Sequence, residues 1–315
     1  GDISLTGAVG AISPLASLTV TSSNALTFGS SLNVTGALTQ SEAATGATTF
    51  TGTVSIGSGT LWGTTFDIKN SFTVKKGTLE ITNSGELSTT GTILLENPNS
   101  SLTISNGGVD TGTVSLGSNI TTSKGNININ ENITLTADLT ISSVNGTGTG
   151  AGNINVGTAG TPRTINSDAV DERNLTLTAG TGDITLTGAV GNTYPLASLT
   201  ITSSKALTFG NSLNVTGALT QSEAATGATT FTGVVTIGSG TLQGTAININ
   251  DSFTVTDGDL AITNSGVLTK STTGEITISG DGKIFTISGG GTVRLGSNIT
   301  TSKGNININE NITLT

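Results

Sequence analysis

Short runs in which apolar and polar residues alternate recur along the whole chain. Typical runs are Leu18-Thr19-Val20, Leu26-Thr27-Phe28 and Ile127-Asn128-Ile129. Alternation places the outer two side chains on one face and the middle one on the other, so each run predicts a short, half-buried β-strand. The gaps between runs hold Gly, Ser, Asn and Asp, which tolerate the backbone angles of tight turns.

Two architectures accommodate short alternating strands at this spacing. A β-sandwich needs hairpin turns, and Asn-Gly signals occur at Asn106-Gly107 and Asn145-Gly146 but are scarce elsewhere. A parallel β-solenoid explains more, because coils of three strands and about 20 residues would stack at about 4.8 Å. The chain then predicts an all-β parallel β-solenoid (β-helix) of roughly 16 coils. No stretch shows sustained helical periodicity; the best short candidate, 40–47, is as readily a loop.

The chain also contains itself nearly twice. Residues 1–61 return at 182–242 with 9 substitutions and 52 identical positions, an offset of 181, and 116–136 returns unchanged at 295–315. These matches predict a partial first repeat (1–136), a segment that completes it (137–181, with a loop at 157–173) and a partial second repeat (182–315). We interpret the chain as one continuous solenoid and a fragment of a longer array, of the kind that provides length or many copies of one surface.

Composition agrees with a folded, weakly charged β protein. The 315 residues include 45 Gly and only 10% charged residues, whereas 33% are hydrophobic. Disordered chains combine low hydrophobicity with high charge, which is not the case here. A net charge of −9 without a basic stripe argues against nucleic acid as a partner. No run approaches the length of a transmembrane segment.

The residue types present exclude several kinds of catalytic chemistry. With no His and no Cys, the chain can form neither a triad that uses them nor a zinc site of those ligands. β-Helical enzymes that cleave pectin need carboxylates clustered with basic residues, and the best such cluster is Asp168, Asp171, Glu172 and Arg173. Because this cluster lies in a stretch that interrupts the alternating runs, we interpret it as a solvated loop rather than an acid–base pair.

Calcium and other cofactors are not expected either. Asp257-Gly258-Asp259 and Asp281-Gly282 offer oxygen ligands in Gly-containing turns, but neither has the spacing of a calcium-binding loop. Both therefore predict ordinary turns. We expect no catalytic residue, no cofactor and no metal.

The aromatic residues differ in whether they recur between the copies. Three Phe residues recur, which predicts stacking inside the coil; the matched sets are Phe28, Phe50 and Phe72, and Phe209, Phe231 and Phe253. Trp62 stands opposite Gln243, and Tyr194 stands opposite Ser13, so neither ring belongs to a repeated site. Together with the acidic cluster, Trp62 and Tyr194 are the candidates for contact with another molecule.

One segment carries a family resemblance. The run 174–191 (NLTLTAGTGDITLTGAVG), followed by 195–203 (PLASLTITS), resembles the repeats of giant bacterial surface exoproteins of the filamentous haemagglutinin-like class. That resemblance implies a right-handed parallel β-helix that forms a long stalk, is secreted to the bacterial cell surface and serves adhesion or a structural fibre. The family's secretion domain lies near the N-terminus of the full protein; we assign no segment of this sequence to it, so the export route is inferred from the resemblance.

The sequence therefore favours a non-enzymatic stalk or fibre that self-associates end to end or laterally and contacts a surface receptor or glycan. A second hypothesis is a ligand- or glycan-binding module that uses repeated loops, since 40–47 returns unchanged at 221–228. A polysaccharide-acting enzyme is a third. An ice-binding solenoid is a fourth, although the irregular spacing of the runs does not predict the flat Thr-x-Thr face that it needs.

Overall fold

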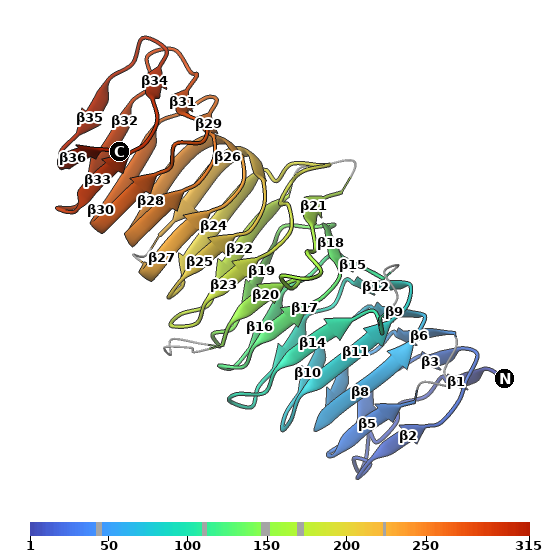
Figure 1. Cartoon of the computed structure of the whole chain (residues 1–315). Helices are drawn as coiled ribbons and strands as arrows, with labels where there is room; N and C mark the ends of the chain where they lie inside the picture. Colours follow the sequence, from blue (N-terminus) through green and yellow to red (C-terminus); the bar gives the residue numbers. More distant parts are fainter. Residues whose placement is uncertain (42–45, 109–111, 146–151, 169–172, 223–224) are drawn as a thin grey trace. The chain divides into compact units, whose positions relative to one another are not determined.

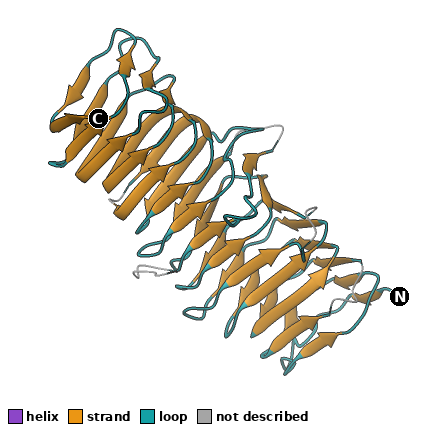
Figure 2. Cartoon of the chain, in the orientation of Figure 1, coloured by secondary structure: helices purple, strands orange, loops and turns teal. Residues whose placement is uncertain are grey.

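The computed structural model of the chain is an all-β parallel β-solenoid of about 13 turns (Figure 1). It describes residues 1–41, 46–108, 112–145, 152–168, 173–222 and 225–315. Within these residues the regular elements are strands and no helix occurs (Figure 2). The chain divides into unit 1, Gly1–Gly157, and unit 2, Thr158–Thr315. Each unit is described by itself below.

In the described part of unit 1, the strands form three stacks, A, B and C, and paired strands within a stack run parallel. Stack A consists of β1 (Ile3–Leu5), β3 (Leu26–Phe28), β6 (Ala47–Phe50), β9 (Thr65–Ile68), β12 (Glu86–Thr89), β15 (Thr113–Leu116) and β18 (Asn132–Leu135). Stack B consists of β4 (Leu32–Asn33), β7 (Val54–Ile56), β10 (Phe72–Val74), β13 (Ile93–Leu95), β16 (Ile120–Thr122) and β19 (Leu139–Ser142). Stack C consists of β2 (Leu18–Val20), β5 (Ala37–Gln40), β8 (Ser58–Gly63), β11 (Leu79–Asn83), β14 (Leu102–Ser105), β17 (Ile127–Ile129) and β20 (Ile154–Val156).

Unit 2 also forms three stacks, which we label A, B and C after the unit 1 strands that their sequences match and not after hydrogen bonding to those strands. Some strands of unit 2 continue round a corner and belong to more than one stack. These long strands are β26 (Leu213–Gln221), β28 (Val235–Ile249) and β30 (Leu260–Lys270). The shorter strands of stack A are β23 (Ile184–Leu186), β25 (Leu207–Phe209), β27 (Ala225–Phe231), β33 (Thr292–Leu295) and β36 (Asn311–Leu314). Those of stack B are β29 (Phe253–Val255), β31 (Ile276–Ile278) and β34 (Ile299–Thr301). Those of stack C are β22 (Asn174–Thr178), β24 (Ser198–Ser203), β32 (Phe285–Ser288) and β35 (Ile306–Ile308), while β21 (Ile165–Ser167) precedes them.

The core consists of the inward side chains of these strands. In β3 the outer residues Leu26 and Phe28 are buried and the middle Thr27 is half-buried, as the alternation predicts. In unit 1, Phe28 stacks on Phe50 at 5.2 Å between ring centroids, and Phe50 meets Phe72 edge-on at 5.3 Å. The matched rings of unit 2 have nearly the same geometry, at 5.1 and 5.4 Å. The predicted core role of these Phe residues is confirmed.

The solenoid has fewer and longer turns than the sequence predicted, about 13 instead of roughly 16. The reason lies in the corners, which take up very different numbers of residues. Leu87 pairs with Phe66, 21 positions before it, but with Val114, 27 positions after it. Val114 then pairs with Ile133 after only 19 positions. The strands thus stay in register while the corners lengthen, so a uniform coil of 20 residues overestimates the number of turns.

Candidate functional site

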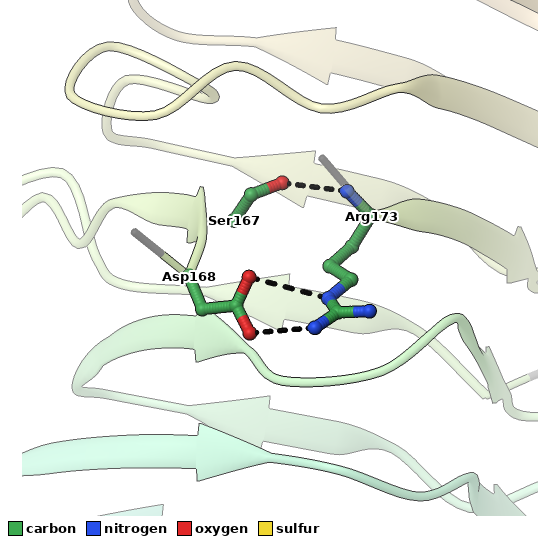
Figure 3. Close-up of polar contacts among 3 residues, drawn as sticks. All are labelled: Ser167, Asp168 and Arg173. Atoms are coloured by element: carbon green, nitrogen blue, oxygen red, sulfur yellow. Dashed lines mark hydrogen bonds and ion pairs between the residues drawn. The ribbon is translucent and has the colours of Figure 1, made fainter. Parts of the chain in front are cut away.

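The predicted acidic cluster contains a closed ion pair. Arg173 donates from Nε to Oδ1 of Asp168 at 3.2 Å and from Nη2 to Oδ2 at 2.7 Å, while its backbone N–H donates to Oγ of Ser167 at 2.9 Å (Figure 3). The two side chains are only 23% and 21% exposed. Ser167 ends β21, and Arg173 directly precedes β22, so the pair joins the two sides of the loop. Asp171 and Glu172 lie outside the described residues.

This geometry defines what the pair can do chemically. A two-point guanidinium–carboxylate contact uses both oxygens of Asp168 and fixes the planes of both groups. It therefore acts first as a clasp that joins the residue after β21 to the residue before β22. Nothing in the geometry assigns Asp168 a catalytic part.

Tyr194 lies one coil further along in unit 2, beside the strand that leads into the clasp. Its backbone carbonyl accepts a hydrogen bond from the N–H of Ser167 at 3.1 Å, and Asn166 Oδ1 accepts from the N–H of Thr193 at 3.0 Å. The side chain of Tyr194 is 44% exposed. The structure thus brings three predicted contact residues, Asp168, Arg173 and Tyr194, into neighbouring coils.

Trp62 lies in unit 1 and does not belong to this group. It is the second-last residue of β8, is half-buried and pairs with Thr82 in β11. A Cβ atom added at Gly107 would lie 3.5 Å from its ring, which shows that the indole extends over the following coils. Trp62 is therefore a side chain that covers neighbouring turns and keeps part of its surface exposed.

A pair of buried polar residues closes the base of the repeated loop at 40–47, which sequence reasoning missed. Gln40 Nε2 donates to Thr48 Oγ1 at 2.8 Å, and Thr48 Oγ1 donates back to Oε1 at 3.2 Å. Gln221 and Thr229 make the same two contacts in unit 2, at 3.1 and 3.3 Å. The sequence did hold a signal for this buried pair, because Gln40 occupies an inward position in the alternating run of β5. Residues 42–45 and 223–224 lie outside the described residues.

A second buried polar contact fills a corner of unit 1. Asn83 Nδ2 donates to Oε2 of Glu131 at 3.0 Å, and both residues are fully buried. Gly112 covers the carboxylate so closely that an added Cβ would come within 2.7 Å of Oε2. Because the carboxylate is enclosed, no substrate can reach it. The sequence signal for this contact was Glu131 itself, an acidic residue that lies between two alternating runs.

Lys270 is the buried charged residue that distinguishes unit 2 from unit 1, where Thr89 occupies the matched position. Its Nζ donates to the carbonyl oxygens of Ser271 at 3.2 Å and Thr273 at 2.5 Å. Burial lowers the pKa of the ammonium from its usual value of 10.5, and the negative charge of Asp251 opposes that change. The ammonium group thus donates hydrogen bonds to two backbone carbonyl groups of its own corner.

The carboxylates weighed as calcium ligands make contacts between coils. Asp259 Oδ1 accepts from the N–H of Ile284 at 2.8 Å, and Asp281 Oδ2 accepts from Nζ of Lys303 at 2.6 Å. Hydrogen bonds from Lys303 and then Ser302 lower the pKa of Asp281. In the part of the chain that the structure describes, no group of three or more Asp, Glu, His or Cys residues is placed to hold a metal ion.

Membrane insertion by a helix finds no support in the described residues, since none of them forms a helix long and apolar enough to cross a bilayer. Comparison with known proteins gives no family model, no curated protein and no solved structure that matches the chain. The function must therefore be argued from the geometry above.

Proposed function

We propose that the chain is a non-enzymatic structural protein, a secreted bacterial cell-surface stalk or fibre of the filamentous haemagglutinin-like kind that serves adhesion or extracellular structure. The proposal combines the resemblance carried by residues 174–191 with the parallel stacking of both units. A surface receptor or glycan and further copies of the chain are its proposed partners.

The observation that carries this proposal is the matched packing of two near-identical copies. The same Phe triplet makes the same stacked and edge-on contacts in each unit, with ring centroids 5.1 to 5.4 Å apart. A chain that builds one coil design twice adds length with each copy, because each turn packs mainly against nearby turns. An enzyme, by contrast, usually depends on one irregular pocket.

Electron microscopy of the longest natural form of the protein tests the proposal. About 13 turns over 315 residues give about 24 residues per turn, so 181 residues make about 7.5 turns. At about 4.8 Å per turn, thin rods with an axial repeat of about 36 Å are expected. Compact particles without that repeat would contradict a stalk.

The secretion part of the proposal needs its own measurement. Surface proteolysis of intact producing cells, read by peptide mass spectrometry, should release peptides of this chain when it is displayed outside the cell. Protection until the cells are lysed would contradict surface display. A cytosolic protein released by the same lysis provides the control.

A second candidate function, binding through the repeated loops, is favoured by the hydrogen bonds between Gln40 and Thr48 and between Gln221 and Thr229. These pairs fix the two ends of each loop in the same way, so the loops start from the same place on both units. Replacing 41–46 and 222–224, which lie between the flanking strands, by Gly-Ser linkers of equal length should abolish binding to immobilised neutral glycans or to cells. Replacing one loop alone should weaken binding less, and unchanged binding after both replacements would exclude the loops.

A further inference from the structure

The outward face of stack C in unit 1 carries an aromatic ring beside a carboxylate. The three strands that form this part of the face, β8, β11 and β14, lie side by side (Figure 1). Trp62 of β8 pairs with Thr82 of β11, and Glu80 of β11 pairs with Thr60 of β8. Trp62 and Glu80 are therefore diagonal neighbours, with roughly 8 Å between their Cα atoms. We term these two residues and the hydroxyl-bearing residues around them the unit 1 platform; the latter are Thr60, Thr82, Thr103 and Ser105.

Unit 2 builds the same face without the ring and the carboxylate. Gln243 occupies the position matched to Trp62, and Ala261 occupies the position matched to Glu80. The surrounding hydroxyl residues are retained in unit 2, where they are Thr241, Thr263, Thr286 and Ser288. The fold therefore needs neither the ring nor the carboxylate, and both are local additions to a face that is otherwise the same.

The indole of Trp62 lies along the stack and crosses β11. A Cβ atom added at Gly107, two residues after β14, would lie 3.5 Å from Cζ3 of Trp62 and 3.1 Å from Cγ2 of Thr82. Since β11 separates β8 from β14, the ring reaches this point only by crossing the strand between them. Trp62 is half-buried, so part of the ring faces solvent. An apolar ring held in this way offers a stacking surface to another flat, apolar group.

The polar groups beside the ring are open to a ligand. Among the described residues, none donates a hydrogen bond to the carboxylate of Glu80, and none accepts one from the indole N–H of Trp62. Thr82 and Ser105 meet through their hydroxyl oxygens at 3.5 Å. An ionised carboxylate only accepts hydrogen bonds and an indole N–H only donates them. A ligand that fits the platform combines an apolar face with hydroxyl groups, which do both.

Resting on the adhesive role proposed above, we propose that the unit 1 platform binds a neutral polysaccharide of the β-1,4-glucan type. A glucose ring in such a chain carries C–H groups on its two faces and hydroxyl groups around its edge. One face stacks on the indole of Trp62, while a hydroxyl group donates to Glu80 in the next coil. Because the rings of an extended glucan repeat at close to the coil spacing of about 4.8 Å, the chain lies along the solenoid axis.

Charge favours a neutral chain over a charged one. Glu80 is the only charged residue in the strands of stack C in unit 1, and the whole chain has a net charge of −9. This charge repels acidic polysaccharides. A single carboxylate does not match a polymer with a positive charge on every ring, whereas one strong acceptor suits one neutral ring.

Titration of the full 315-residue chain with cellohexaose, a soluble β-1,4-glucan, tests the proposal. Trp62 is the only tryptophan, so its fluorescence reports occupancy of the platform directly, and isothermal titration calorimetry should give one site per chain. Trp62→Gln, which introduces the residue found at Gln243, should weaken binding at least tenfold. Trp62→Phe keeps an aromatic face and should lose less. Glu80→Ala should also weaken binding, and Glu80→Gln should lose less because its amide oxygen still accepts a hydrogen bond.

Unit 2 provides a matched control and a gain of binding. Gln243→Ala lies outside the platform and should leave the binding of cellohexaose unchanged. Gln243→Trp combined with Ala261→Glu should build a second platform and raise the stoichiometry from one site to two. Far-UV circular dichroism confirms that each variant is folded.

Three results would overturn the proposal. They are no saturable binding of cellohexaose at millimolar concentration, unchanged binding in Trp62→Gln, and tighter binding of the acidic hexagalacturonate than of cellohexaose. Binding that survives Trp62→Gln but is lost when 41–46 and 222–224 are replaced would assign the glycan to the loops instead. Rods in the electron microscope would still support the stalk if the platform bound no glycan.

Discussion

Phe50 offers the most direct measure of how the inward rings stabilise unit 1. It is fully buried and contacts two other rings, Phe28 at 5.2 Å and Phe72 at 5.3 Å. Phe66 is also buried to within 1% but belongs to no ring pair that the structure records. Phe50→Ala and Phe66→Ala therefore remove the same atoms from similar depths and differ in ring contacts.

The expected losses follow from these environments. Truncation of a buried Phe to Ala lowers the free energy of unfolding by about 3–5 kcal/mol. Each aromatic pair contributes about 0.5–1.5 kcal/mol beyond burial, so two pairs add about 1–3 kcal/mol. We expect about 5 kcal/mol for Phe50→Ala and about 3 kcal/mol for Phe66→Ala.

Urea titration followed by tryptophan fluorescence suits this comparison, because Trp62 is the only tryptophan and lies in unit 1. Far-UV circular dichroism on the same samples follows the strands of both units. A loss for Phe50→Ala no greater than that for Phe66→Ala would refute the contribution of the ring pairs. A loss below about 1 kcal/mol for both would refute the core position of the rings.

Three further predictions concern the polar contacts. Folding lowers the pKa of Lys270, so between that lowered pKa and 10.5 the unfolded chain binds more protons than the folded chain, and the free energy of unfolding rises with pH. Lys270→Thr, which introduces the residue found at the matched position Thr89, should remove this rise. Thermal unfolding measured across alkaline pH tests the prediction. Arg173→Ala should lower the free energy of unfolding of unit 2 by about 1–2 kcal/mol, between the values for exposed and buried pairs, and double substitution with Asp168→Ala should cost less than the sum of the two single substitutions in urea titrations. Gln40→Ala should lower the free energy of unfolding by about 1–3 kcal/mol, because the buried hydroxyl of Thr48 loses its partner. The same substitution should speed limited proteolysis at 41–47. An unchanged digestion rate would argue that the Gln40–Thr48 hydrogen bonds do not hold this segment.

The strands could be predicted from the sequence because each needs only a local pattern. The alternation in Leu26-Thr27-Phe28 predicts a strand with one buried face, and the structure has this strand as β3. The matched Phe residues could likewise be assigned to the core, since a large apolar side chain at an inward position has few other places to go.

The number of turns and the polar contacts could not be predicted, because both depend on residues far apart in the sequence. The contact of Asn83 with Glu131 spans 48 positions, so no local pattern predicts it. Gln40 resembled a loop residue by type, yet Thr48 gives it a buried partner. Of the candidate site, the sequence showed that Asp168 and Arg173 lie close together along the chain, whereas their two-point pairing needed the fold.

The variable corners have a consequence for how such a gene can change. The two copies differ in length only where strands end: 87–93 has two residues fewer than 268–276, and 105–113 has four more than 288–292. The strands on either side of these corners still pair in register in both units. A genetic crossover between copies, at any matched strand, would therefore encode a continuous core. Gain or loss of a whole repeat by such recombination would change the length of the protein and leave its cross-section unchanged.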